Sequence, residues 1–178
     1  MLLTWVKRNF PEKKPGMTKR CYFDTSIFGG YFDDEFSKES RILFNQVIEG
    51  KIICLYSELT ERELYPAPTH VHNLLKNLPS IFSERLVINQ KVINLAEEYI
   101  NQKVVGKTSR EDCTHIAIAT IYQADLLVSW NFKHIVNSNR IRGYNHVNSQ
   151  HGLTQITIKS PREIIWKHRR VLSKAMIA

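Results

Sequence analysis

Short apolar segments separated by helical segments constrain the fold of this chain more than any other feature. Residues 52–56 form a continuous apolar run, which is typical of a strand covered on both faces of a sheet. The predicted strands are residues 21–23, 52–56, 126–130 and, more weakly, 156–158. The first predicted helix follows residue 24, and the last begins at residue 160. The helices predicted between them span residues 40–49, residue 57 to the prolines at 66 and 68, and residues 71–78, 92–103 and 109–124. Because strands separated by helices pair in parallel, the sequence predicts an α/β fold with three α/β/α layers and a central, mostly parallel sheet.

Length and composition favour a single globular domain. The chain has 178 residues, of which 43% are hydrophobic and 24% are charged. A chain of this size buries roughly 70% of its unfolded surface, which is enough for one substantial core. Residues 1–19 are predicted to be an N-terminal extension outside the core, and residues 20–178 a domain with a basic C-terminal helix.

The cysteines indicate the compartment. Cys21, Cys54 and Cys113 lie far apart, each within an apolar segment, so neither a disulfide framework nor a paired-cysteine metal site fits. They are expected to be buried thiols in a reducing cytoplasm. No stretch of the sequence approaches the ~18 apolar residues of a membrane span, so no membrane partner is expected.

Carboxylates stand where predicted elements begin or end, in a chain whose net charge is +8. Asp24 and Asn131 follow two predicted strands, Glu63 lies in the helix after the second strand, and Asp112 lies in the first turn of the helix before the third. Ligands of parallel sheets gather beyond the carboxyl ends of the strands, so these four side chains are expected to converge. An acidic cluster in a basic chain suits an enzyme that binds a divalent cation and a polyanionic substrate.

Two of the acids have a simpler interpretation. Asp112 lies three residues after Ser109, and Glu63 lies three residues after Thr60. Either pair could be a capping box that satisfies the amides of a first helical turn. Asp24 is harder to explain in this way, because an acid that closes an apolar strand loses solvation and needs a partner.

Four segments resemble the ordered motifs of PIN-domain nucleases. They are residues 22–26, 57–64, 112–119 and 124–135. The block Trp130-Asn131-Phe132-Lys133-His134 is similar to that of the VapC-like branch, and the likeness spans about residues 20–165.

This resemblance implies an α/β/α domain that acts as a single-strand-directed endoribonuclease with Mg²⁺ or Mn²⁺ as cofactor. Its products would carry 5′-phosphate and 3′-hydroxyl ends. Family members often serve as the toxin of a toxin–antitoxin pair and many dimerise, so the implied partners are RNA, an antitoxin protein and a second copy of the chain.

The acidic positions of the family fall on Asp24, Glu63 and Asp112, which would hold the metal. Asn131 stands at the fourth catalytic position, where the family usually has aspartate. An asparagine offers a neutral oxygen, so this exchange should weaken metal binding or suit a role behind the direct ligands.

Other side chains near the acids have proposed supporting roles. The hydroxyls of Thr25 and Ser129 are placed to hydrogen-bond the acids and fix their orientation. His115 lies on the same helix face as Asp112 and could contact substrate or metal, but a packed core histidine is the favoured interpretation.

Basic residues indicate where RNA would bind. Lys133, Arg140 and Arg142, with Tyr144 beside them, suit a single strand whose phosphates are bound by charge and whose base stacks on a ring. A second basic run occupies residues 167–170, for which a solvated face that aids solubility is an equal alternative.

Competing functions can be weighed against the same residues. An aspartyl-phosphate phosphatase would need a second acid at the position of Ser26, and a dinucleotide-binding enzyme would need a GxGxxG turn that Gly29 and Gly30 do not supply. The remaining alternative is a catalytically weakened PIN domain, marked by Asn131, that binds RNA or protein.

Overall fold

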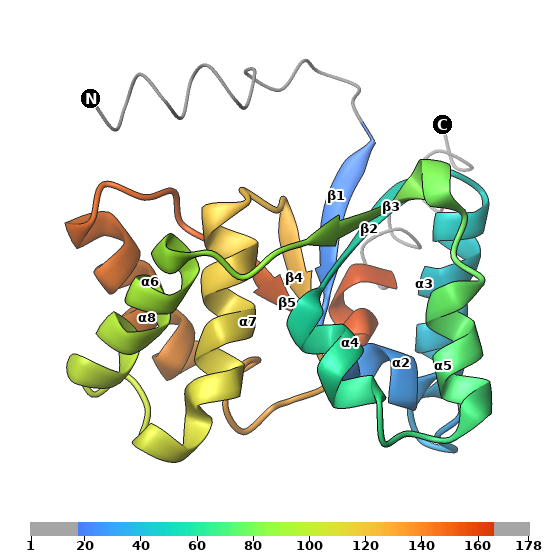
Figure 1. Cartoon of the computed structure of the whole chain (residues 1–178), viewed down its shortest axis with the longest axis horizontal. Helices are drawn as coiled ribbons and strands as arrows, with labels where there is room; N and C mark the ends of the chain where they lie inside the picture. The colour runs from blue at the N-terminus through green and yellow to red at the C-terminus, as the bar shows by residue number, and fades with distance from the viewer. Residues whose placement is uncertain (1–17, 166–178) are drawn as a thin grey trace, which may run out of the picture.

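A five-stranded sheet, parallel throughout, forms the centre of the molecule (Figure 1). The computed structural model describes residues 18–165. The strands are β1 Lys19–Phe23, β2 Ile52–Ser57, β3 Ser83–Leu86, β4 Leu126–Val128 and β5 Ile158–Lys159, in the spatial order β3-β2-β1-β4-β5. The helices are α2 Thr25–Gly30, α3 Ser37–Ile48, α4 Glu58–Leu64, α5 Thr69–Lys76, α6 Gln90–Asn101, α7 Arg110–Ile121 and α8 Ser138–Gln150. The predicted α/β/α architecture is confirmed.

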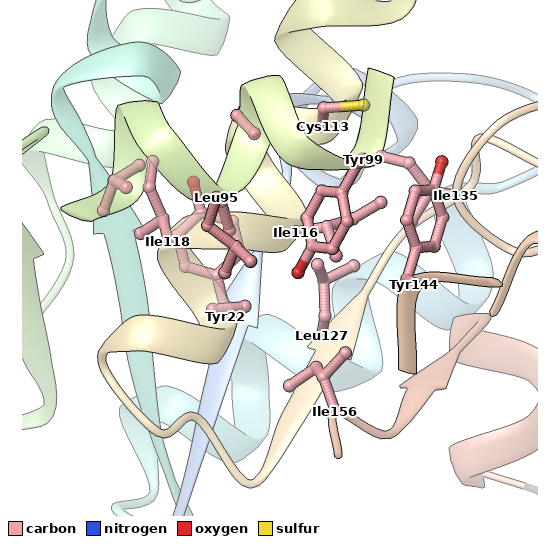
Figure 2. Close-up of a cluster of buried hydrophobic side chains, with 14 of the residues drawn as sticks. Tyr22, Leu95, Tyr99, Cys113, Ile116, Ile118, Leu127, Ile135, Tyr144 and Ile156 are labelled. Atoms are coloured by element: carbon pink, nitrogen blue, oxygen red, sulfur yellow. The ribbon is translucent and has the colours of Figure 1, made fainter. Parts of the chain in front are cut away.

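Two separate cores cover the two faces of the sheet, because neighbouring residues of a strand point to opposite sides. In β1, Tyr22 belongs to a cluster completed by α6, α7 and α8. Cys21 and Phe23 belong to a second cluster completed by α2, α3 and α5. Figure 2 shows part of the first cluster, in which the rings of Tyr99 and Tyr144 lie beside one another. The sheet is therefore covered on both sides and its backbone is protected from water.

Two elements that the sequence did not predict complete this arrangement. The edge strand β3 reads Ser-Glu-Arg-Leu, which carries almost no apolar signal, and charged pairs such as Arg20 with Glu84 fix it beside β2. Helix α8 is rich in asparagine and serine, and its buried positions are only Tyr144, Val147 and Asn148. Propensity and periodicity are weak in both segments, so packing against the rest of the fold decides their conformation.

Local interactions set the ends of two helices. Asp24 is the N-cap of α2, and its carboxylate accepts the Ser26 amide. Gly50, two residues after the end of α3, has φ of +67°, a left-handed conformation that glycine adopts without strain.

Several predictions concern the ends of the chain. β1 begins at Lys19, the last residue of the predicted extension. Residues 1–17 and the basic run at 167–170 lie outside the described residues. Among residues 18–165, no helix has the length and apolar character needed to cross a membrane.

Candidate active site

The predicted site residues lie beyond the carboxyl ends of the strands. Asp24 follows β1, and Ser129 and Asn131 follow β4. Glu63 lies in α4, which continues directly from β2, and Asp112 lies in the first turn of α7 (Figure 1). Residues from four distant segments are thus brought to one side of the sheet by the parallel topology.

Asp24 is buried and fully engaged by hydroxyl and amide donors. Only 3% of its surface is exposed. Its Oδ1 accepts the Ser26 amide at 3.1 Å and the Ser26 hydroxyl at 2.5 Å, and its Oδ2 accepts the Ser129 hydroxyl at 2.8 Å. The same two serines receive the backbone amides of Trp130 and Asn131, so the loop after β4 is joined to the start of α2 through this carboxylate.

Glu63 is held by a chain of hydrogen bonds that starts in the core. The Thr25 hydroxyl donates to Glu63 Oε2, which also lies 3.0 Å from His115 Nε2. On the other side of the ring, His115 Nδ1 lies 2.7 Å from the buried Tyr22 hydroxyl, which is 2.7 Å from Ser57 Oγ. His115 is packed, as favoured from the sequence, and it also contacts one of the candidate ligands.

Asp112 is hydrogen-bonded by Asn131, which stands at the position where PIN-domain nucleases usually have a fourth acid. The Asn131 amide donates to Asp112 Oδ1 at 2.7 Å, and the Asn131 oxygen accepts the His134 amide at 3.0 Å. The asparagine is therefore oriented by the backbone and presents a donor, not an acceptor, to Asp112.

The capping interpretation of Asp112 and Glu63 is wrong. Ser109 makes no side-chain capping bond, and its hydroxyl lies 3.3 Å from His134 Nδ1. The N-cap of α4 is Ser57, in a capping box with Thr60, so Glu63 has no part in it. Both acids are free of a capping duty and face the side chains described above.

Burial and mutual repulsion disfavour the charged forms of two acids. Burial raises the pKa of Asp24 and of Asp112 above the ordinary aspartate value, and the nearby charge of Glu63 raises the pKa of both further. Burial would also raise the pKa of Glu63, but the hydrogen bond and charge of His115, with the Thr25 hydrogen bond and the charge of Arg62, lower that pKa overall. Glu63 is therefore close enough to Asp24 and to Asp112 to influence both electrostatically.

No lysine or arginine in residues 18–165 forms an ion pair with any of the three acids. The hydrogen bonds described above use Oε2 of Glu63 and Oδ1 of Asp112 and leave the second oxygen of each available. Hard cations such as Mg²⁺ prefer these oxygen donors, so the residue types fit a divalent metal. Across the described ranges, no group of three or more His, Cys, Asp or Glu side chains lies close enough to hold an ion as the side chains stand. Simultaneous ligation by all three acids would require side-chain rotation or bridging water.

The predicted RNA-binding residues lie in the loop after β4 and in helix α8. Lys133 is exposed beside His134, and the Arg140 guanidinium contacts the His134 ring. Burial and these two cations lower the pKa of His134, whereas the charge of Asp112 raises it, so Lys133 and Arg140 lie near the acidic end of the site. Arg142 lies two positions along α8 and bonds Asn139.

Tyr144 cannot stack on a base. Its ring is fully buried, its hydroxyl donates to the His134 carbonyl at 3.0 Å, and its edge meets Tyr99. The expectation of an exposed ring here is wrong, because the unpredicted helix α8 turns Tyr144 toward the core.

Sequence reasoning missed the hydroxyl chain behind Glu63. Tyr22 is predicted as a strand residue and Ser57 as the start of a helix, and only the fold brings their hydroxyls within 2.7 Å of one another. No signal in the sequence joins these two hydroxyls to Glu63.

Replacing Tyr22 with Phe should cost about 1–3 kcal/mol of folding free energy, because it leaves His115 Nδ1 without its buried partner. Denaturant unfolding would measure the loss. Tyr99→Phe is a matched control, since it also removes a buried hydroxyl, the one that donates to Asn148 at 2.6 Å on the other side of α7. Both variants should be less stable than the wild type. Only Tyr22→Phe should disturb Glu63, so equal rates of RNA cleavage by the two variants would contradict the link between Tyr22 and Glu63.

Comparisons with known proteins bear on the fold. No family model matches the chain, and no curated protein matches it. Among solved structures, the crystal structure of VapBC2 from Rickettsia felis, bound to a DNA fragment from their promoter, is similar with a TM-score of 0.50 and 14% sequence identity. The similarity covers 79% of this chain and 98% of that one. At this identity the likeness concerns the fold alone, and it supports the PIN-like α/β/α architecture.

Proposed function

We propose that this protein is a metal-dependent endoribonuclease that hydrolyses phosphodiester bonds of single-stranded RNA. One observation carries the proposal. In a chain with net charge +8, Asp24, Glu63 and Asp112 come from segments at the carboxyl end of a parallel sheet, and the charge of Glu63 raises the pKa of both aspartates. Within residues 18–165 none of the three pairs with a lysine or arginine. Carboxylates in this arrangement suit a divalent cation, and the positive net charge of the chain favours a polyanionic substrate.

Asp24, Glu63 and Asp112 would hold Mg²⁺ or Mn²⁺, with water completing the contacts that the side chains do not reach. A bound ion would acidify a water molecule and offset charge on the phosphate. The chain's own residues prepare the acids for this duty. Ser129 holds Asp24 and Thr25 holds Glu63, so each carboxylate is oriented before any ligand arrives.

Asn131 would act as a catalytic residue by positioning Asp112. Its amide donates to one oxygen of Asp112, and its own oxygen is fixed by the His134 amide, so the carboxylate keeps one orientation. This arrangement supports a site with one well-held metal rather than two.

Lys133, Arg140 and Arg142 are the proposed phosphate contacts. Lys133 and Arg140 stand next to His134 and near Asp112, where a phosphate entering the site would need positive charge. The family resemblance implies that water attacks phosphorus and the P–O3′ bond breaks, which would leave 5′-phosphate and 3′-hydroxyl ends.

The proposed biological role is the toxin of a toxin–antitoxin pair. The resemblance of the motifs and the fold shared with VapBC2 support it. An antitoxin protein and a second copy of the chain are the proposed protein partners. A reducing cytoplasm is the proposed location, and the free, buried state of Cys21, Cys54 and Cys113 is consistent with it.

Purified protein should cleave labelled single-stranded RNA in Mn²⁺ or Mg²⁺ and stop when EDTA is added. RNA binding should weaken steeply with salt, because phosphate contacts release counterions. Glu58→Gln is a suitable control, since Glu58 lies in the same helix as Glu63 but pairs with Arg85 away from the acids. Salt-sensitive RNA binding without cleavage under any divalent metal would instead favour the alternative, a catalytically weakened PIN domain that binds RNA.

A further inference from the structure

A row of three aromatic rings begins beside Asn131. Phe36 stacks on Trp130 with ring centroids 4.5 Å apart and planes at 28°, and Phe132 lies against Trp130 at 6.1 Å and 56°. Trp130 is 5% exposed, whereas Phe132 is 47% exposed. The row therefore has a buried centre and presents one large ring to solvent at Phe132, the residue after Asn131.

The buried ring at the centre of the row is fixed. The indole nitrogen of Trp130 donates to Ser40 Oγ at 2.9 Å, and the Arg162 guanidinium lies 5.4 Å from the Trp130 ring. Gly30 allows this close approach, because a Cβ there would lie 2.8 Å from the indole nitrogen. Phe132 thus rests on a rigid support, so little side-chain freedom would be lost when a ligand covers it.

In the sequence, the exposed ring lies between a residue that contacts an acid and a residue that carries a positive charge. Asn131, on one side of Phe132 in sequence, bonds Asp112, and the exposed Lys133 follows on the other side. The Phe132 amide is held by the Trp130 carbonyl at 3.0 Å in a tight turn. Because Phe132 directly follows the residue that bonds Asp112, a base next to a phosphate held near Asp112 would be within reach of this ring.

We propose that Phe132 is a stacking platform for an unpaired nucleobase adjacent to the phosphate that is cleaved. This inference rests on the proposed ribonuclease function and specifies how it selects its substrate. In a duplex both faces of a base are already stacked, so only a single strand can place a base on Phe132. Stacking accepts any base, so the platform provides a preference for single strands without strict sequence recognition.

The test measures RNA binding in EDTA, where no metal-dependent cleavage occurs. A short single-stranded RNA containing 2-aminopurine reports stacking by fluorescence quenching, and anisotropy of a labelled copy reports Kd. Phe132→Leu should abolish the quenching and raise Kd roughly tenfold to a hundredfold. Phe132→Trp should retain both, because an aromatic face remains. Under cleavage conditions, Phe132→Leu should raise KM more than it lowers kcat.

Ile81→Ala is the matched control for removal of an exposed apolar side chain. Ile81 is 77% exposed and precedes β3, at the opposite edge of the sheet, so its loss should leave quenching and Kd unchanged. Unchanged binding by Phe132→Leu would overturn the inference, as would lost binding that Phe132→Trp fails to restore. Quenching by a wild-type protein that cleaves no RNA would support the platform while contradicting the nuclease proposal, so the two failures are distinguishable.

Discussion

Asp24→Asn is expected to abolish RNA cleavage and, in the same protein, to raise stability. The substitution removes a charge that the proposed metal needs, and loss of such an electrostatic contact lowers the rate by about a hundredfold or more. Folding opposes that charge, because burial and the neighbouring Glu63 raise the pKa of Asp24. Asparagine can keep the N-cap bond to the Ser26 amide. A gain of about 1 kcal/mol would raise Tm by about 2–4 °C.

The pH dependence of this gain is a second readout. A carboxyl whose folded pKa is raised takes up a proton more readily when folded, so wild-type protein gains stability as pH falls through that raised pKa. The Tm advantage of Asp24→Asn should therefore be largest near neutral pH and shrink as pH falls toward the ordinary aspartate pKa. An active variant, or a stability difference that does not change with pH, would contradict the role of Asp24.

Asn131→Asp should destabilise the metal-free protein and strengthen its response to metal. The 2.7 Å contact from the Asn131 amide to Asp112 Oδ1 would become a contact between two oxygens, at a cost of about 1–3 kcal/mol. The new acid can still accept the His134 amide, so the change is confined to the side that faces Asp112. With a fourth negative charge, Mn²⁺ should bind about tenfold or more tightly.

Thermal unfolding with and without Mn²⁺ separates these effects, because a ligand that binds only the folded state raises Tm. Asn131→Ala is the control. It loses the hydrogen bond without adding charge, so it should be less stable and show no larger response to Mn²⁺. The interpretation of Asn131 would fail if Asn131→Asp matched the wild type in both stability and Mn²⁺ response.

The parallel sheet and the positions of the acids could be predicted because their signals are local. An apolar run followed by Asp24 marks the end of a strand, and the topology then places Asn131 at the same edge. The sequence alone could not decide whether Glu63 and Asp112 cap helices or face the candidate site, because the same spacing also fits a capping box. Only the folded chain reveals that Ser57 caps α4 and that the Ser109 hydroxyl contacts His134.

Long-range packing explains the remaining differences. Tyr144 appeared beside two arginines as an exposed ring, but helix α8 buries it against Tyr99, and that helix has almost no periodic signal of its own. Phe132 carried no signal as a single residue. Its significance depends on Trp130 beneath it and on Asn131 beside it, and these relations exist only in three dimensions.

The central claim is that Asp24, Glu63 and Asp112 bind one divalent cation, and anomalous scattering from a crystal grown with Mn²⁺ tests it most directly. The account predicts one strong peak among these carboxylates, with at least one oxygen at about 2.0–2.6 Å and the others reached directly or through water. Crystals of the Asp24→Asn variant, grown with Mn²⁺ in the same way, should lack that peak. A Mn²⁺ peak elsewhere on the protein, or none at saturating Mn²⁺, would contradict the proposed metal site and the nuclease mechanism built on it.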